Sequence, residues 1–204
     1  MSGSPIKRSL GVKPLLYPEP VLLVGTYDDH GKANLMTAAW GGICNSNPTS
    51  LMVALRPATY SHDHVIERKA FTVGIATERL VREADFLGMA SGRDRDKFAD
   101  AGLTPVRAEK VDAPYAAECP VVLECSLVLH QSLGLHTIMI GAIQDVKVDE
   151  DCLDADGKVP DMGKIAPLIF DSGAGSYFGV GAFIAKAFDK NNPLLSASRI
   201  PDKP

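Results

Sequence analysis

The segment from Leu55 to His62 brings together residue types that suit a phosphate group. Arg56 supplies a guanidinium group, and Thr59 and Ser61 supply hydroxyl groups, within one turn of chain. Ser61 also stands where an N-cap would precede a helix, and the free N–H groups at a helix start favour an anion. Arg56 can add a charge-assisted contact. The alternative is that Arg56 pairs with a surface carboxylate and that Ser61 only caps the helix.

A second segment, from Thr37 to Asn45, joins small residues to Trp40, the only tryptophan, and to the thiol of Cys44. Small residues permit close approach of a flat ring, and backbone amides along such a segment can meet the carbonyls and ring nitrogens of a heterocycle. The alternative for Trp40 is that it simply packs in the hydrophobic core. Cys44 is either a nucleophile or a buried, inert thiol, because no basic residue lies nearby in sequence to activate it.

Two further motifs have competing interpretations. His136 interrupts an apolar segment at the start of a predicted strand, so it is equally a core histidine and a functional one. The stretch Gly173–Gly179 is similar to a dinucleotide-binding fingerprint, which requires a following helix and a second parallel strand. Since the 25 residues after Gly179 carry no second strand pattern, we expect a glycine-rich loop there.

No segment predicts a metal site. His62 and His64 are two residues apart, so on a helix they point to different faces. The acidic segment 145–161 lacks the positional pattern of a calcium loop. We therefore expect no metal ligands in this chain.

Short strands with few helices between them must position these residues. The apolar runs predict strands, a turn at 28–32 predicts a hairpin, and Ser61 and Thr77 are expected to cap the N-termini of two helices. The expected strands are 20–27, 33–40, 50–55, 70–76, 121–129 and 135–148. The predicted class is mainly β with α insertions, and a barrel is favoured over a doubly wound sheet.

Length and composition limit the classes of protein. We expect one domain over residues 1–189, followed by a C-terminal tail at 190–204 that contains three prolines. A net charge of −4 argues against nucleic acid and against anionic membranes as partners. The four cysteines form no Cys-x-x-Cys pair and no secretory signal opens the chain, so we expect a reduced, cytoplasmic protein.

Several of these segments together resemble the flavin reductase-like, FMN-binding split-barrel family, and within it the flavoredoxins. The resemblance covers about residues 10 to 185 and rests on motifs that occur in the family's order. The motifs are Met36-Thr37-Ala38-Ala39-Trp40-Gly41-Gly42, Leu55-Arg56-Pro57-Ala58-Thr59-Tyr60-Ser61, Glu67-Arg68-Lys69-Ala70-Phe71-Thr72-Val73 and Gly134-Leu135-His136-Thr137.

The resemblance implies a six-stranded Greek-key split β-barrel that forms a homodimer and binds one FMN per subunit near the dimer interface. It implies that His136 is a catalytic residue on the nicotinamide side and that a set of residues binds the cofactor. Thr37, Ala38, Ala39 and Trp40 would lie against the isoalloxazine, Arg56, Thr59, Ser61 and Lys97 would bind the phosphate, and Tyr60 and Cys44 complete the cofactor-binding set. Leu135 stands where the family usually has an acidic residue.

The expected function is therefore an FMN-dependent oxidoreductase that passes electrons from NAD(P)H through FMN to a small molecule or a protein. The alternative is an electron carrier that holds FMN and is reduced by a protein partner. A third interpretation is a barrel that binds a flavin or another heterocycle without turnover.

Overall fold

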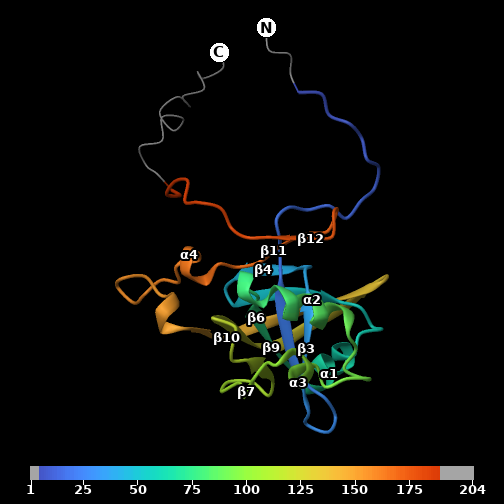
Figure 1. Cartoon of the computed structure of the whole chain (residues 1–204). Helices are drawn as coiled ribbons and strands as arrows, with labels where there is room; N and C mark the ends of the chain where they lie inside the picture. Colours follow the sequence, from blue (N-terminus) through green and yellow to red (C-terminus); the bar gives the residue numbers. More distant parts are fainter. Residues whose placement is uncertain (1–4, 189–204) are drawn as a thin grey trace, which may run out of the picture.

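Seven antiparallel strands form the main sheet of this computed structural model, which describes residues 5–188 (Figure 1). The edge strands of the sheet are consecutive in the chain, with only Ala39 and Trp40 between them. Neighbouring strands lie about 4.8 Å apart, so two residues cannot cross a flat sheet of this width. The sheet must curl until its edges approach each other, which makes it a split barrel. In spatial order the strands are β3 (Ala33–Ala38), β2 (Leu22–Tyr27), β6 (Ala70–Ile75), β9 (Val121–Leu133), β10 (His136–Val148), β5 (Thr49–Leu55) and β4 (Gly41–Ser46).

The predicted mainly β split barrel is confirmed, with seven strands in place of the expected six. The additional strand is β4, which contains two glycines and an asparagine and was not among the expected strands. β4 pairs with β5 through a register shift between Ile43 and Asn45. Glycine and asparagine are depleted in strands, which hid β4 in the sequence. The predicted single strand 33–40 ends at Ala38.

A second, smaller sheet contains the glycine-rich motif near the end of the described chain. It consists of β1 (Glu19–Pro20), β11 (Ile169–Asp171) and β12 (Ser176–Phe178). Gly173 and Gly175 lie in the turn of the β11–β12 hairpin. A strand, and not a helix, therefore follows them, which agrees with the expected loop and not with a dinucleotide-binding unit. The strands β7 (Pro105–Arg107) and β8 (Pro114–Ala116) form a separate hairpin.

The helices are short and lie between strands or beside the barrel. They are α1 (Ser61–Arg68), the 3₁₀ turn η1 (Glu78–Leu80), α2 (Val81–Met89), α3 (Lys97–Ala101), η2 (Glu150–Cys152) and α4 (Met162–Ile165). Both expected side-chain caps were wrong. The residue before α1 is Tyr60, and Ser61 lies inside the helix. Thr77 precedes η1 but makes no capping hydrogen bond.

The core has two parts, which lie on opposite faces of β2. Leu22 and Val24 belong to the cluster inside the barrel, together with Phe71 and Met139. Leu23, from the other face, belongs to a cluster that includes side chains of α2 and α3. Because both faces of β2 are covered, its sequence is continuously apolar and does not alternate with polar residues.

The chain ends run away from the barrel on the same side, as Figure 1 shows for the blue and red segments. The expected tail at 190–204 lies outside the described residues, and the domain boundary at 189 stays a prediction. Within residues 5–188, none of the helices has the length and apolar character that a membrane span requires.

Candidate functional site

A cavity of about 190 Å³ lies beside the first turn of α1. Four residues of the expected cofactor set line it: Thr59, Tyr60, Ser61 and Lys97. The opposite wall comes from β3, through Asn34 and Met36, and from the end of α2 with the loop that follows it. Three separate parts of the sequence therefore meet here, as the motif order implied.

Lys97 gives this cavity a buried cation. The residue is 3% exposed, and its Nζ donates a hydrogen bond to the carbonyl oxygen of Leu87 at 2.7 Å, in the last turn of α2. Burial lowers the pKa of Lys97 to about 8, and no carboxylate contributes to this shift. A buried ammonium group without a carboxylate partner favours an anionic ligand in the adjoining cavity.

Ser61 and Tyr60 are held in place from the β2–β3 hairpin. The buried Oγ of Ser61 accepts a hydrogen bond from Asn34 Nδ2 at 2.8 Å, so its own hydrogen stays free to donate to a ligand. The hydroxyl of Tyr60 donates to Asp28 Oδ2 at 2.9 Å. Burial and this hydrogen bond raise the pKa of Tyr60 above its ordinary value. The Tyr60 hydroxyl is therefore a neutral donor to Asp28, and the tyrosine contributes its ring to the cavity.

The loop after α2 contributes a guanidinium group that the sequence analysis missed. Arg93 donates from Nη1 to the carbonyl oxygen of Ala58 at 3.0 Å, and its Cζ lies 5.6 Å from the centroid of the Tyr60 ring. Ala58 and Tyr60 both line the cavity, so Arg93 lies at its rim. Arg93 lies in the charged segment 91–97, from which the sequence analysis selected only Lys97.

A second cavity, of about 360 Å³, adjoins the first along Gly88 and Met89, which line both. Thr37 and Ala39 line it from the barrel side, and Tyr177 lines it from β12. The hydroxyl of Thr37 donates to the carbonyl oxygen of Ala84 at 2.6 Å, which fixes α2 against β3. This cavity has the small-residue wall that was expected to accept a flat ring.

Ala38 does not share this orientation. Successive strand residues point to opposite faces, and the methyl group of Ala38 is buried in the cluster inside the barrel. The side chain of Ala38 therefore does not lie against a ring in the second cavity, and only its backbone is available there.

Trp40 and His136 lie together near the split of the barrel. Their ring centroids are 4.6 Å apart and the rings are tilted by 43°. Trp40 is 40% exposed, which excludes the core role that was its alternative. His136 is half-buried at the start of β10, so it is not a core histidine either. The structure thus brings together Trp40, which was expected beside the isoalloxazine, and His136, which was expected beside the nicotinamide.

Arg56 and Cys44, like Ala38 and Trp40, belong to the expected cofactor set but line neither cavity. Arg56 is exposed at the end of β5, and its carbonyl oxygen accepts hydrogen bonds from Thr59. Leu55 pairs with Thr137, so extending this register by one position sets Arg56 level with His136. Cys44 is exposed on β4, which excludes the buried thiol that was considered for it. The Arg56 and Cys44 side chains therefore lie on open surface.

The fold is that of a flavin reductase-like split barrel, and the comparisons agree. The chain belongs to the family described as flavin reductase like domain, whose model matches residues 15–175. It is similar to flavoredoxin of Desulfovibrio vulgaris (Miyazaki F), with 50% identity, a TM-score of 0.86, and coverage of 91% of this chain and 99% of that chain. A flavoredoxin from Methanosarcina acetivorans is 30% identical, with a TM-score of 0.83 and coverage of 94% and 100%.

The likeness to more distant solved structures supports the fold alone. An FMN-binding protein from Thermus thermophilus is 21% identical, with a TM-score of 0.73 and coverage of 89% of this chain and 99% of that chain. Among curated relatives, uncharacterized proteins of Aeropyrum pernix and Archaeoglobus fulgidus are 36% and 34% identical over 54% and 55% of this chain. The match spans only 43% and 63% of the length of those two proteins.

Proposed function

We propose that this protein is an FMN-binding oxidoreductase that takes electrons from NAD(P)H and passes them to a small-molecule or protein acceptor. The observation that carries the proposal is the cavity beside α1, in which the buried ammonium group of Lys97 has no carboxylate partner. The hydroxyl of Ser61 lines the same wall and is free to donate. A dianionic phosphate monoester matches this set of donors.

The residues present fit FMN on a second ground, the adjoining cavities. Since Gly88 and Met89 line both, one ligand can extend from the anion-binding end to the wall formed by Thr37 and Ala39. Gly92 keeps the first cavity closed on its loop side, because a Cβ there would overlap Asn34 and the ring of Tyr60. FMN, when bound, supplies the two-electron chemistry that accepts a hydride and passes electrons on.

The chain's own residues would then have separate tasks. Lys97 and Ser61 bind the phosphate, with Arg93 at the rim of the same cavity. Thr59 lines the cavity wall, and its hydroxyl donates to the carbonyl oxygen of Arg56. Backbone groups of the Thr37–Trp40 segment donate to the ring edge. His136, held against Trp40, orients the nicotinamide so that hydride transfer occurs from one geometry.

A second candidate is an electron carrier that holds FMN and is reduced by a protein partner. Two observations favour it. Leu135, which is 62% exposed, stands beside His136 in the position where an acidic residue was expected. The 50% identity with a flavoredoxin extends over nearly the whole of both chains. Binding without turnover is the remaining possibility.

We also propose a homodimer in the cytoplasm. Large apolar side chains on the outer half of β9 and at the β9–β10 turn are exposed, which suits burial against a second copy. These include Val128 at 59%, Leu133 at 66% and Leu135 at 62%. All four cysteines are free thiols, which suits a reducing compartment.

The test is a spectrum followed by reduction. Purified protein should be yellow and should release FMN, not FAD, on heat denaturation. Anaerobic mixing with NADH and then with NADPH should bleach the flavin band with one of the two. If dithionite reduces the flavin but neither nucleotide does, the result favours the second candidate, an electron carrier reduced by a protein partner. Protein that is colourless and takes up no added FMN would end the flavin proposal.

A further inference from the structure

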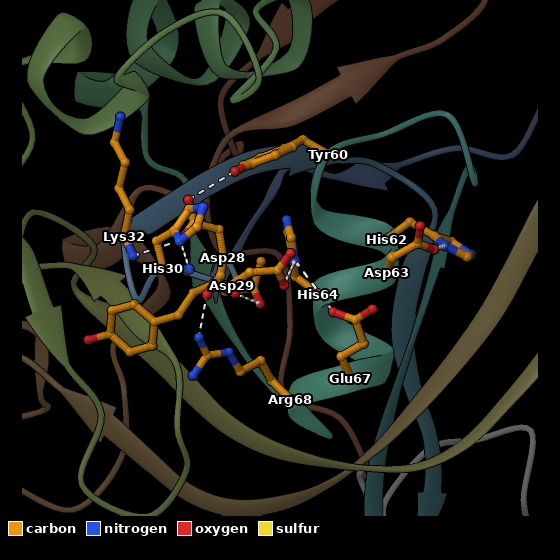
Figure 2. Close-up of polar contacts among 12 residues, drawn as sticks. Asp28, Asp29, His30, Lys32, Tyr60, His62, Asp63, His64, Glu67 and Arg68 are labelled. Atoms are coloured by element: carbon orange, nitrogen blue, oxygen red, sulfur yellow. Dashed lines mark hydrogen bonds and ion pairs between the residues drawn. The ribbon is translucent and has the colours of Figure 1, made fainter.

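Three side chains of metal-ligating types come together between the β2–β3 turn and α1, as Figure 2 shows. Asp29 belongs to the turn between β2 and β3, and His64 and Glu67 lie one turn apart on α1. Nδ1 of His64 lies 3.3 Å from Asp29 Oδ1 and 3.9 Å from Glu67 Oε2. The three ligand atoms all lie within 4.8 Å of one another. Nearest neighbours around a tetrahedral ion with bonds of about 2.0 to 2.1 Å lie about 3.4 Å apart. The His64–Asp29 spacing matches this value, and the exposed carboxylate of Glu67 has to move closer to complete the set.

The imidazole of His64 is the informative member of this cluster. His64 is 9% exposed, and its Nδ1 is buried with no hydrogen-bond partner in the part of the chain that the structure describes. His62, two residues earlier, has both ring nitrogens engaged, with Asp63 at 2.6 Å and Thr137 at 2.8 Å. A buried ring nitrogen without a hydrogen bond costs free energy unless another group satisfies it. Nδ1 points at the two carboxylates, where an ion would satisfy it.

The cations nearest in sequence do not neutralise these carboxylates. Lys32 pairs with Asp96 at 3.4 Å, and Arg68 pairs with Asp112 at 2.9 Å and donates to the backbone carbonyl of Asp28. Among the ion pairs of residues 5–188, Asp29 and Glu67 have no Lys or Arg partner. The two carboxylates therefore face His64 without a lysine or arginine to pair with them.

We propose that Asp29, His64 and Glu67 bind one divalent transition-metal ion of the zinc type. One imidazole and two carboxylates suit Zn²⁺ better than Mg²⁺ or Ca²⁺, which prefer oxygen ligands alone. Three protein ligands leave at least one position for water. The sequence analysis missed this site because it weighed the pair His62 and His64, whereas Asp29 lies on another element.

The site is structural and supports the cofactor cavity from behind. The ion joins the β2–β3 turn to α1, two elements that otherwise hold together near this point through Tyr60 and Arg68. The Tyr60 ring lies edge-on to His64, with centroids 4.7 Å apart, and the same tyrosine lines the cavity. An ion that fixes His64 thereby fixes the start of α1.

The experiment measures Zn²⁺ uptake by the full chain with whatever flavin it carries, after treatment with a chelator. Equilibrium dialysis with metal analysis should give one Zn²⁺ per chain, and millimolar Mg²⁺ should not compete. Glu67→Gln and Asp29→Asn should each weaken binding by at least about tenfold, and His64→Gln should abolish stoichiometric uptake. Zn²⁺ should raise the Tm of the unmodified protein and not that of these variants.

Three controls separate this site from adventitious binding. Asp63→Asn removes the same charge from the same helix, with a side chain that is 73% exposed, and should keep the site. His130→Gln and Cys44→Ser remove an exposed imidazole and an exposed thiol elsewhere and should also keep it. Asp29 and Glu67 are exposed, so their variants test the site even if His64→Gln does not fold. Absence of stoichiometric uptake, uptake unchanged in all three cluster variants, or uptake lost in Cys44→Ser would each overturn the proposal.

Discussion

At the scale of single residues, the protonation of Lys97 should make the affinity for FMN depend on pH. In the flavin-free protein its pKa is about 8, because burial disfavours the ammonium form. A phosphate dianion attracts that form only, and the phosphate itself has lost its second proton well below pH 7. FMN affinity should therefore stay level between pH 7 and about pH 8 and fall above it, by up to about tenfold per pH unit. Flavin fluorescence titrations at fixed ionic strength measure this.

The matched variants are Lys97→Met and Lys97→Arg. Lys97→Met should weaken FMN binding at pH 7 by about 1.5 to 3 kcal/mol and remove the pH dependence. Lys97→Arg should retain the charge, with no decline above pH 8. Arg56→Ala should have the smaller effect, because Arg56 is exposed and lines neither cavity. The assignment of the phosphate to Lys97 fails if Arg56→Ala is the more damaging change.

His136 is the residue on which the use of nicotinamide depends. Its ring lies against Trp40, outside both cavities, so His136→Ala should retain the full flavin content and should still be bleached by dithionite. Reduction by NAD(P)H should slow by at least about tenfold, which equals 1.4 kcal/mol of transition-state stabilisation. Stopped-flow absorbance under anaerobic conditions gives both results. Loss of FMN from the variant would instead make His136 part of the cofactor pocket.

The sequence identified many cavity residues by type, yet it did not give the direction of their side chains. Thr59, Ser61 and Lys97 line one cavity as expected. Arg56 was selected because it lies in the same short segment as the hydroxyl groups, but its side chain is exposed, and Arg93 was not considered. Proximity along a chain does not fix which side chains converge, whereas the tertiary fold does.

At the scale of elements, the loop after α2 closes the cavity only because Gly92 has no side chain. A Cβ at Gly92 would overlap Asn34 Oδ1 and the ring of Tyr60. Gly92→Ala should therefore displace the loop from Ser61 and weaken FMN binding by at least about tenfold, with a smaller loss of stability. Gly42→Ala is the control, because a Cβ there meets nothing within 4 Å. Equal FMN affinity in both variants would show that the loop does not close the site.

Elements with strong apolar patterns were predictable, and elements defined by tertiary contacts were not. β2 and β6 follow from their apolar runs, since both are buried strands. β4 is exposed over most of its length and carries glycine and asparagine, so only its pairing with β5 makes it a strand. The start of α1 was expected one residue late, because Asn34, from β3, binds the hydroxyl that was expected to cap the helix.

At the scale of the whole molecule, the outer half of β9 pairs with β10 on one edge, and its pairing with β6 on the other edge ends at Ser126. The last six residues of β9 are exposed, including Leu133 at 66%. Burying such side chains gains about 25 cal/mol per Å² of apolar surface removed from water, which favours association with a second copy. A flavin site near that interface would retain FMN better in the dimer than in the monomer.

Leu133→Asp should therefore split the dimer and raise the dissociation constant for FMN by at least about tenfold, because a charge on this surface opposes burial. Light scattering after size-exclusion chromatography gives the mass, and ultrafiltration gives the retained flavin. Met162→Asp is the control, since Met162 is 62% exposed in the first turn of α4, where an acidic residue is tolerated. An unmodified protein that is monomeric at micromolar concentration and saturated with FMN would refute both the dimer and the shared site. A Leu133→Asp monomer with undiminished FMN affinity would keep the dimer but place the flavin within one chain.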